Sequence, residues 1–342
     1  MGIRVEADPA ELGFDAARLE RLDRHFARYV DDGRLPAFLA VVARRGRVVH
    51  VGAQGCAPDA LWRIFSMTKP ITSVAALSLY EEGAFELTDP VERFLPEFAG
   101  MRVYARGSAQ RPLPLLFEPG AEWNYSVATD VLGRVLEVVA GRSLDAVLRE
   151  RVLDPLGMDE TAFWAPEARA DRLVPLHVPH PETRLAVRED GFGAQALREP
   201  AMLSGGGGLV STAADYHRFA LMLLGEGELD GVRVLGPLTA RYMGRNHLPG
   251  GADLEAFGRP LFAETTFDGT GFGLGVSVVV DAAAAKVVCS EGELAWGGAA
   301  STAFWVDPRE ELTVLFFTQL LPSSTHPIRP QLRQLVYQAL VD

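Results

Sequence analysis

The stretch Phe65-Ser66-Met67-Thr68-Lys69-Pro70 opens a run of apolar and small residues that continues to Gly83. This pattern predicts a helix over about residues 68–82, closed by a glycine just past its end. Ser66 then lies at the start of the helix, and Lys69, three residues on, shares its face. A serine hydroxyl becomes a nucleophile when a neighbouring base accepts its proton, and amides at a helix N-terminus can donate to developing negative charge. The pair is therefore a candidate nucleophile and base.

Lysine usage strengthens this interpretation. Of the 33 basic residues in the chain, only Lys69 and Lys286 are lysines. Arginine cannot act as a base because its pKa exceeds about 12, whereas a buried lysine can lose its proton. The alternative stays open that Ser66 is only a helix cap and Lys69 a surface residue.

Two further stretches carry side chains or backbone suited to the same chemistry. Trp123-Asn124-Tyr125-Ser126-Val127 precedes a helix predicted over residues 127–140, and Trp296-Gly297-Gly298-Ala299 lies between two predicted strands. A tyrosine hydroxyl can relay a proton, and paired glycines let backbone come close to a substrate. Taken alone, each stretch is more often explained by packing or by a turn than by catalysis.

In this order, the three stretches resemble the motifs of the serine β-lactamase and penicillin-binding-protein superfamily. The sequence is most similar to class C β-lactamases and to the carboxylesterases built on the same fold, often called family VIII esterases. The resemblance includes Phe117-Glu118-Pro119-Gly120 and the glycine-rich run over residues 204–212. It implies that Ser66 is the nucleophile and that Lys69 and Tyr125 share the general-base and general-acid roles.

The resemblance also implies the remaining site residues. The backbone amides of Ser66 and Ala299 would form the oxyanion hole. The predicted substrate-binding residues are Trp123, Val127, Trp296, Gly297 and Gly298.

The sequence departs from the class C pattern at two places in the motifs. Class C β-lactamases carry Lys-Thr-Gly where this chain has Trp296-Gly297-Gly298, and Asn where it has Val127. The missing lysine removes a positive charge that would meet a carboxylate, and the missing asparagine removes an amide partner. Both changes favour neutral esters over β-lactams. A third departure is that residues 101–116 form a shorter segment than in relatives, which would leave the cleft unusually open.

The order of expected elements predicts the fold class. A helix is expected over residues 14–29, a hairpin over 39–51, and helices over 144–153 and from Thr212 to about residue 224. The last third holds strand-like runs and a final helix, over residues 272–280, 286–290, 300–306, 312–318 and 331–340. Strands at both ends with helices between them predict an α+β fold, with one antiparallel sheet formed by both termini. The resemblance implies that this is the β-lactamase-like fold.

We expect two lobes with the active site in the cleft between them. Residues 1–65 plus 265–342 would form the α/β sheet lobe, and residues 66–264 a mainly helical lobe that carries the Ser and Tyr motifs.

Composition and spacing exclude several other classes. A net charge of −12 argues against a nucleic-acid partner. We expect no metal and no cofactor, because His177 and His180 lie in a proline-containing loop and Cys56 and Cys289 are isolated. No apolar run reaches the ~18 residues of a membrane span, and the N-terminus lacks a signal-like apolar region, so the expected location is the cytoplasm.

The leading functional hypothesis is a serine hydrolase that cleaves small carboxylic esters through an acyl-enzyme on Ser66. The same groups could serve an acyltransferase, or a hydrolase of small amides or β-lactams. A catalytically weak acyl- or peptide-binding protein is a further alternative. The expected partner is a small-molecule ester, and the sequence carries no signal for an oligomeric state.

Overall fold

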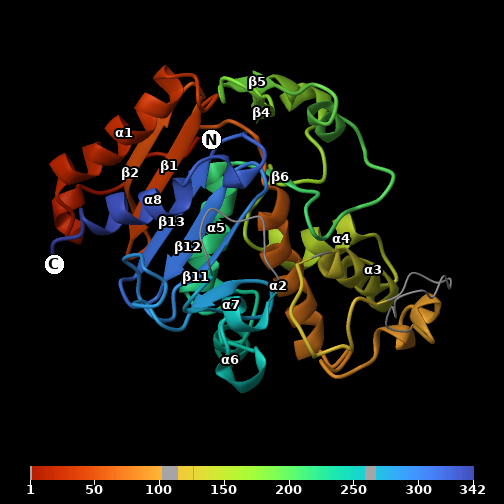
Figure 1. The fold of residues 1–342 in the computed structure, drawn as a ribbon. Coiled ribbons are helices and arrows are strands. Elements are labelled where there is room, and N and C mark those ends of the chain that lie inside the picture. Colours follow the sequence, from red (N-terminus) through yellow and green to blue (C-terminus); the bar gives the residue numbers. More distant parts are fainter. Residues whose placement is uncertain (1, 102–114, 126, 259–266) are drawn as a thin grey trace.

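A seven-stranded antiparallel sheet runs through the centre of the protein. The computed structural model describes residues 2–101, 115–125, 127–258 and 267–342. The strand order is β2-β1-β13-β12-β11-β10-β9, as Figure 1 shows. Strands β1 (Phe38–Arg44) and β2 (Arg47–Gln54) come from the N-terminal part, and the other five from the C-terminal part. The predicted α+β fold, with a sheet built from both termini, is confirmed.

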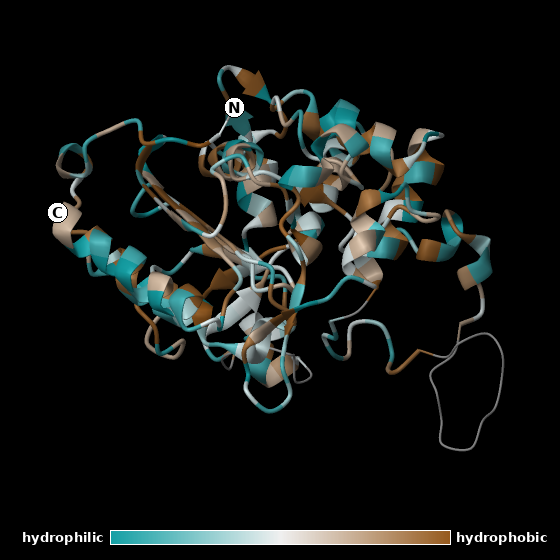
Figure 2. Cartoon of the chain, turned by 90° about the horizontal axis from the view of Figure 1, so that it is seen from above, coloured by the Kyte–Doolittle hydropathy of each residue, from teal (hydrophilic) through white to brown (hydrophobic). Residues whose placement is uncertain are grey.

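Both faces of the sheet are covered by helices. Successive side chains of a strand point to opposite faces, and in β1 both sets are buried. Phe38, Ala40 and Val42 pack with residues of α1 (Ala16–Asp31) and α8 (Ile328–Tyr337). The alternate residues join the core that contains α2 (Thr68–Glu81) and α5 (Ala213–Leu224). In Figure 2, brown apolar strands accordingly run between helices whose outer turns are hydrophilic.

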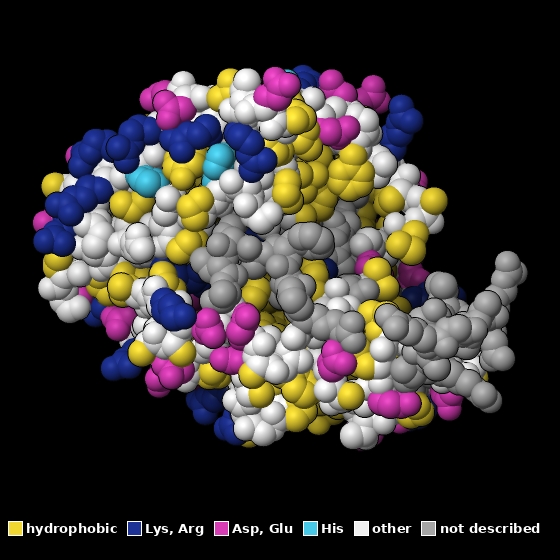
Figure 3. Space-filling view, in the orientation of Figure 1, with side chains coloured by type: hydrophobic (Ala, Val, Ile, Leu, Met, Phe, Trp, Pro, Cys, Tyr) yellow, Lys and Arg dark blue, Asp and Glu magenta, His cyan; other side chains and the backbone are white. Residues whose placement is uncertain are grey.

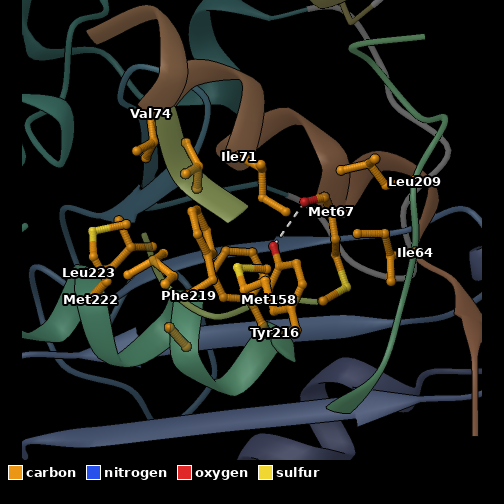
Figure 4. Close-up of a cluster of buried hydrophobic side chains, with 14 of the residues drawn as sticks. Ile64, Met67, Ile71, Val74, Met158, Leu209, Tyr216, Phe219, Met222 and Leu223 are labelled. Atoms are coloured by element: carbon orange, nitrogen blue, oxygen red, sulfur yellow. Dashed lines mark hydrogen bonds between the residues drawn. The ribbon is translucent and has the colours of Figure 1, made fainter. Parts of the chain in front are cut away.

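Helix α2 lies in the middle of the molecule. All of its residues from Thr68 to Leu79 are buried, which is typical of a helix surrounded by protein on every side. Figure 4 shows side chains of α2 against Tyr216 and Phe219 of α5, and the Tyr216 hydroxyl donates a hydrogen bond to the Met67 carbonyl at 2.9 Å. The chain is therefore held at the residue that follows Ser66.

The remaining helices lie mostly beside α2. Helices α3 (Ala128–Ala140) and α4 (Leu144–Leu148) both contact α2. Further along the chain are α6 (Pro237–Met243) and α7 (Leu254–Phe257). Helix α5 belongs to the middle of the chain, yet it packs on β12 (Ala303–Asp307) and β13 (Leu312–Phe317). A helix from the range 66–264 thus covers the sheet, and the predicted lobe boundaries remain a prediction.

Three expectations about the C-terminal strands are corrected. The single strand predicted over residues 272–280 is two antiparallel strands, β9 (Thr270–Phe272) and β10 (Ser277–Val279). The chain reverses between them at Gly275, whose φ of +94° favours glycine. The strand predicted over residues 286–290 is wrong, because that apolar stretch lies in a loop where Val288 is exposed. The Trp296 motif is itself part of β11 (Leu294–Gly297) rather than a link between strands.

Smaller differences concern local structure. The helix predicted over residues 144–153 is α4 followed by a π-helical turn, Arg149–Leu153. His177 begins β4 (His177–Pro179), which pairs with β5 (Ala186–Arg188), instead of lying in a loop. The other short strands pair as β3 (Trp62–Arg63) with β6 (Val210–Ser211) and β7 (Glu228–Leu229) with β8 (Val232–Arg233).

The surface carries both signs of charge. Figure 3 shows acidic and basic side chains interspersed, with a run of basic side chains over α1, where Arg18, Arg21, Arg24 and Arg28 lie. Within the described ranges, no His, Cys, Asp and Glu side chains form a group able to hold a metal ion. In the same part of the chain, no helix has the length and hydropathy to span a bilayer. Cys56 and Cys289 are both free thiols.

A buried ion pair fixes α8 to the sheet. Arg333 of α8 donates to Glu293 Oε1 from Nε at 3.0 Å and from Nη2 at 2.5 Å. The Tyr337 hydroxyl lies 2.9 Å from Glu293 Oε2 and 2.7 Å from Asp307 Oδ2. Burial raises the pKa of the Glu293 carboxyl, and the Arg333 guanidinium opposes that shift.

Removing one partner of this pair should cost far more than removing a surface charge. We expect Glu293→Ala to lower the free energy of unfolding by about 3–5 kcal/mol, because Arg333 is left buried without its counter-charge. Glu20→Ala is the control: it removes the exposed pair with Arg24 at 3.1 Å and should cost below about 1 kcal/mol. Urea denaturation measures both, and equal losses would contradict the prediction.

Candidate active site

Ser66 and Lys69 meet at the N-terminus of α2. Ser66 lies in a short 3-10 turn, Phe65–Met67, directly before the helix. Lys69 Nζ is 3.4 Å from Ser66 Oγ and donates to the Gly206 carbonyl at 2.6 Å. The lysine is only 7% exposed. The amine therefore lies between the Ser66 hydroxyl and the Gly206 carbonyl. A proton can pass from the hydroxyl to the amine once the distance between them shortens.

The backbone just before Ser66 adopts a rare conformation. Phe65 has a φ of +44°, which is uncommon for a residue other than glycine and is found where surrounding structure imposes it. Its ring stacks on Phe192 with 6.0 Å between centroids. Two residues earlier, the buried Arg63 donates to the carbonyls of Val174 and Gly193, and burial lowers the pKa of its guanidinium to about 10. These contacts hold the turn from which Ser66 reaches the cavity.

Tyr125 reaches the same place from another part of the chain. Its ring centroid lies 4.6 Å from Lys69 Nζ. The preceding segment is anchored where the Trp123 amide donates to the Phe257 carbonyl at the end of α7, at 3.1 Å. The structure thus brings Ser66, Lys69 and Tyr125 together, as their predicted shared roles require.

An aromatic wall stands beside this group. The ring of Trp296 lies 5.6 Å from that of Tyr125 and 5.2 Å from that of Phe272. Phe272 also packs on Trp123, at 4.9 Å. Sequence reasoning did not single out Phe272, because aromatic residues in strands are ordinary core residues and no motif marks it.

The end of β11 approaches the Ser66 segment closely. A Cβ on Gly298 would lie 2.4 Å from the Ile64 carbonyl oxygen, so only glycine fits there. Ser66 and Ala299 line one cavity, and neither backbone amide donates a hydrogen bond to another residue in the described ranges. Two such amides beside a serine hydroxyl are able to bind a developing oxyanion.

The cavity at this site has a volume of about 860 Å³, within the range typical of small-molecule sites. Its lining begins at Ser66 and Tyr125 and continues past the end of β11 to the face of the sheet under α8. The lining residues between Tyr125 and the sheet face include Trp296, Gly297, Gly298, Ala299, Val279, Cys289, Ala303 and Trp305. Two of the predicted substrate-binding residues, Trp123 and Val127, are not among the described lining residues. Trp123 stacks on the Tyr125 ring, and the Val127 side chain is 62% exposed.

The positive charges along the cavity already have partners. Lys286 lies 3.5 Å from Asp268, and Arg333 pairs with Glu293. Arg329 Nη2 donates to the Gly298 carbonyl at 3.2 Å. The wall is therefore mainly apolar and aromatic, with its cations engaged.

Two features named in the sequence analysis include residues that the structure does not describe. These residues are 102–114, within the short segment over residues 101–116, and Ser126, in the tyrosine motif.

Comparison with known proteins identifies the family. Residues 22–103 and 107–338 match the family described as Beta-lactamase. The chain belongs to the beta-lactamase family. It is 31% identical to an uncharacterized protein of Mycobacterium tuberculosis, over 85% of this chain and 88% of that protein. It is 30% identical to esterase EstB of Burkholderia gladioli, over 96% and 98% of the two chains.

A solved structure agrees with this assignment. EstCE1, described as a hydrolase with promiscuous acyltransferase activity, superposes with a TM-score of 0.77 at 27% identity. The match covers 94% of this chain and 98% of EstCE1. The family and these relatives identify a serine hydrolase of the beta-lactamase type, with esterases and acyltransferases among its homologues. The EstB alignment spans 405 positions, more than the 342 residues of this chain, so EstB has residues without a counterpart here.

The close approach at Gly298 leads to a test. We expect Gly298→Ala to lower the free energy of unfolding by about 1–3 kcal/mol, because its Cβ would collide with backbone that cannot move freely. Gly207→Ala is the matched control, since its Cβ would meet no atom closer than 3.8 Å. Thermal unfolding of both variants checks this, and an equal loss in the two would contradict it.

Proposed function

We propose that this protein hydrolyses small carboxylic esters through an acyl-enzyme on Ser66. The observation that carries the proposal is the buried Lys69 amine, 3.4 Å from the Ser66 hydroxyl and under the Tyr125 ring. A serine needs a base within hydrogen-bonding reach to become a nucleophile.

The proposed reaction has two half-reactions. Ser66 Oγ attacks the ester carbonyl carbon while its proton passes to the Lys69–Tyr125 pair. The oxyanion accepts hydrogen bonds from the amides of Ser66 and Ala299. The tetrahedral intermediate formed by this attack then collapses and breaks the bond between the carbonyl carbon and the alcohol oxygen. The alcohol leaves after it takes up the proton held by the Lys69–Tyr125 pair. Water then attacks the acyl-enzyme in the same way and releases the acid and Ser66. We assign the proton to the pair, because Lys69 contacts both Ser66 and the Tyr125 ring, and Tyr125 lines the same cavity as Ser66.

The cavity favours uncharged esters. Trp296 stands where class C β-lactamases carry a lysine, and it forms a flat apolar wall with Phe272. The cationic side chains farther along the cavity are engaged with carboxylates or carbonyls. A substrate carboxylate would therefore lose its hydration without gaining a free cation.

Acyl transfer is the second candidate, and the size of the cavity favours it. A volume of about 860 Å³ leaves room for an acceptor alcohol beside a short acyl group. EstCE1, a hydrolase with promiscuous acyltransferase activity, is similar in structure. Acyl-ester product in excess of free acid, with an alcohol present, would favour transfer over hydrolysis.

The central test compares four proteins on p-nitrophenyl butyrate. We expect Ser66→Ala and Lys69→Arg each to lower kcat/KM by at least about 10³-fold, because the first removes the nucleophile and the second a group that can deprotonate. Ser78→Ala is the control: Ser78 lies on the same helix, and its hydroxyl donates a hydrogen bond to the Ala75 carbonyl within that helix. A fluorophosphonate should label the wild type and not Ser66→Ala. Undiminished activity in Ser66→Ala would contradict the proposal.

The same reasoning predicts poor β-lactam turnover. We expect kcat/KM for nitrocefin to be at least about 100-fold below that for p-nitrophenyl butyrate, since the β-lactam carboxylate meets Trp296 instead of a lysine. Parallel assays at one pH measure the ratio. Sustained nitrocefin hydrolysis at a rate comparable to that of the ester would overturn the preference for neutral esters.

A further inference from the structure

The loop over residues 204–209, here called the glycine loop, lies between α2 and α3. Side chains of α2 bind the backbone of this loop. Thr72 Oγ1 donates to the Gly205 carbonyl at 2.8 Å, and Thr68 Oγ1 accepts from the Leu209 amide at 3.2 Å. Lys69 adds the bond to the Gly206 carbonyl at 2.6 Å.

Asp130, in the first turn of α3, binds the glycine loop from the other side. Its Oδ1 accepts from Ser204 Oγ at 2.5 Å and from the Gly206 amide at 3.1 Å. The peptide unit between Gly205 and Gly206 is therefore held at both ends, its carbonyl by Thr72 and its amide by Asp130. The next carbonyl along the chain is the one that accepts from Lys69.

Two positions of the glycine loop leave no room for a side chain. A Cβ on Gly205 would lie 2.7 Å from the Thr129 carbonyl oxygen, and one on Gly206 would lie 2.7 Å from Asp130 Oδ2. Glycine fits at these two positions, yet glycine has little conformational preference of its own. The direction of the Gly206 carbonyl must come from the hydrogen bonds that hold its neighbours.

We propose that Asp130 is a positioning residue for Lys69. It holds the Gly206 carbonyl against Lys69 Nζ and so sets the place of the amine relative to Ser66. Asp130 also follows Tyr125 by five residues, so the same contact fixes the helix after Tyr125 against the helix that carries Lys69. Asp130 is not among the described lining residues of the cavity, and it acts through other groups. This inference rests on the proposed function.

The consequence of losing Asp130 follows from the hydrogen bonds. Without that side chain, the Gly206 carbonyl is free to turn away from Lys69. The Lys69 amine then loses an acceptor that fixes its position and is no longer held toward Ser66. The value of kcat should therefore fall, with little change in KM.

The experiment compares Asp130→Ala, Asp130→Asn and Ser204→Ala with the wild type on p-nitrophenyl butyrate. We expect Asp130→Ala to lower kcat about 10- to 100-fold, with KM within about twofold, because misplacing a catalytic group by about 1 Å costs this much. Asp130→Asn keeps an acceptor oxygen for the Gly206 amide and should recover part of kcat. Ser204→Ala leaves that amide bond in place and should lose less than Asp130→Ala.

A matched carboxylate provides the control. Asp145 lies in the first turn of α4 and pairs with Arg149, at 3.4 Å. Asp145→Ala should leave kcat and KM unchanged. Thermal unfolding of every variant separates loss of activity from loss of fold. If Asp130→Ala does not fold, Asp130→Asn and Ser204→Ala test the inference in its place.

The outcomes distinguish this inference from the proposed function. An unchanged kcat in the Asp130 variants overturns the inference, as does a lower kcat that follows unfolding with no recovery in Asp130→Asn. If the wild type hydrolyses no ester, the proposed function fails. The rate of Ser66 phosphonylation then replaces kcat as the readout, and it must change in Asp130→Ala for the inference to stand.

Discussion

The burial of α2 from Thr68 to Leu79 is the constraint on which the rest of the structure depends. This helix carries polar side chains into the centre of the protein, and buried polar groups must find hydrogen-bond partners. Thr68, Lys69 and Thr72 all find them on the glycine loop, at Leu209, Gly206 and Gly205. The Tyr216 hydroxyl satisfies the Met67 carbonyl from the side of the sheet. Satisfying these groups brings the loop, α3 and α5 to their places around α2.

The same constraint creates the site. Because Lys69 is enclosed, its amine has few acceptors, and Ser66 Oγ is one of them. The end of β11 reaches the Ser66 segment only because Gly298 has no side chain. Trp296, on the same strand, then contacts Tyr125 and makes the wall of the cavity apolar. Helix packing, a glycine and a strand end thus combine to bring the Ser66 hydroxyl, Ala299 and Tyr125 to one cavity, with the Lys69 amine beside the hydroxyl.

Asp130 links this packing to the proposed chemistry. Three segments must keep a common geometry: the start of α2, the residues before α3, and the glycine loop. The Asp130 carboxylate, in the first turn of α3, binds the glycine loop, and the loop binds the start of α2. A beta-lactamase-type hydrolase with a lysine as its basic group needs such an arrangement, because a flexible amine with several rotatable bonds is otherwise poorly positioned.

Local patterns in the sequence determined much of this protein. The spacing of Ser66 and Lys69 predicted a shared helix face, because helical periodicity depends only on near neighbours. The apolar runs at both ends predicted the two-ended sheet for the same reason. The apolar stretch over residues 286–290 shows the limit of such patterns: it looks like a strand, but it has no neighbouring strand to pair with and lies in a loop.

Tertiary structure alone decided the rest. The contact of Tyr125 with Lys69, the two bonds of Asp130 to the glycine loop, and the place of Phe272 in the aromatic wall all join residues far apart in the chain. No periodicity encodes them, because each depends on how whole helices and strands pack. The sequence thus determined which chemical groups are present, and the packing around α2 decided which of them meet.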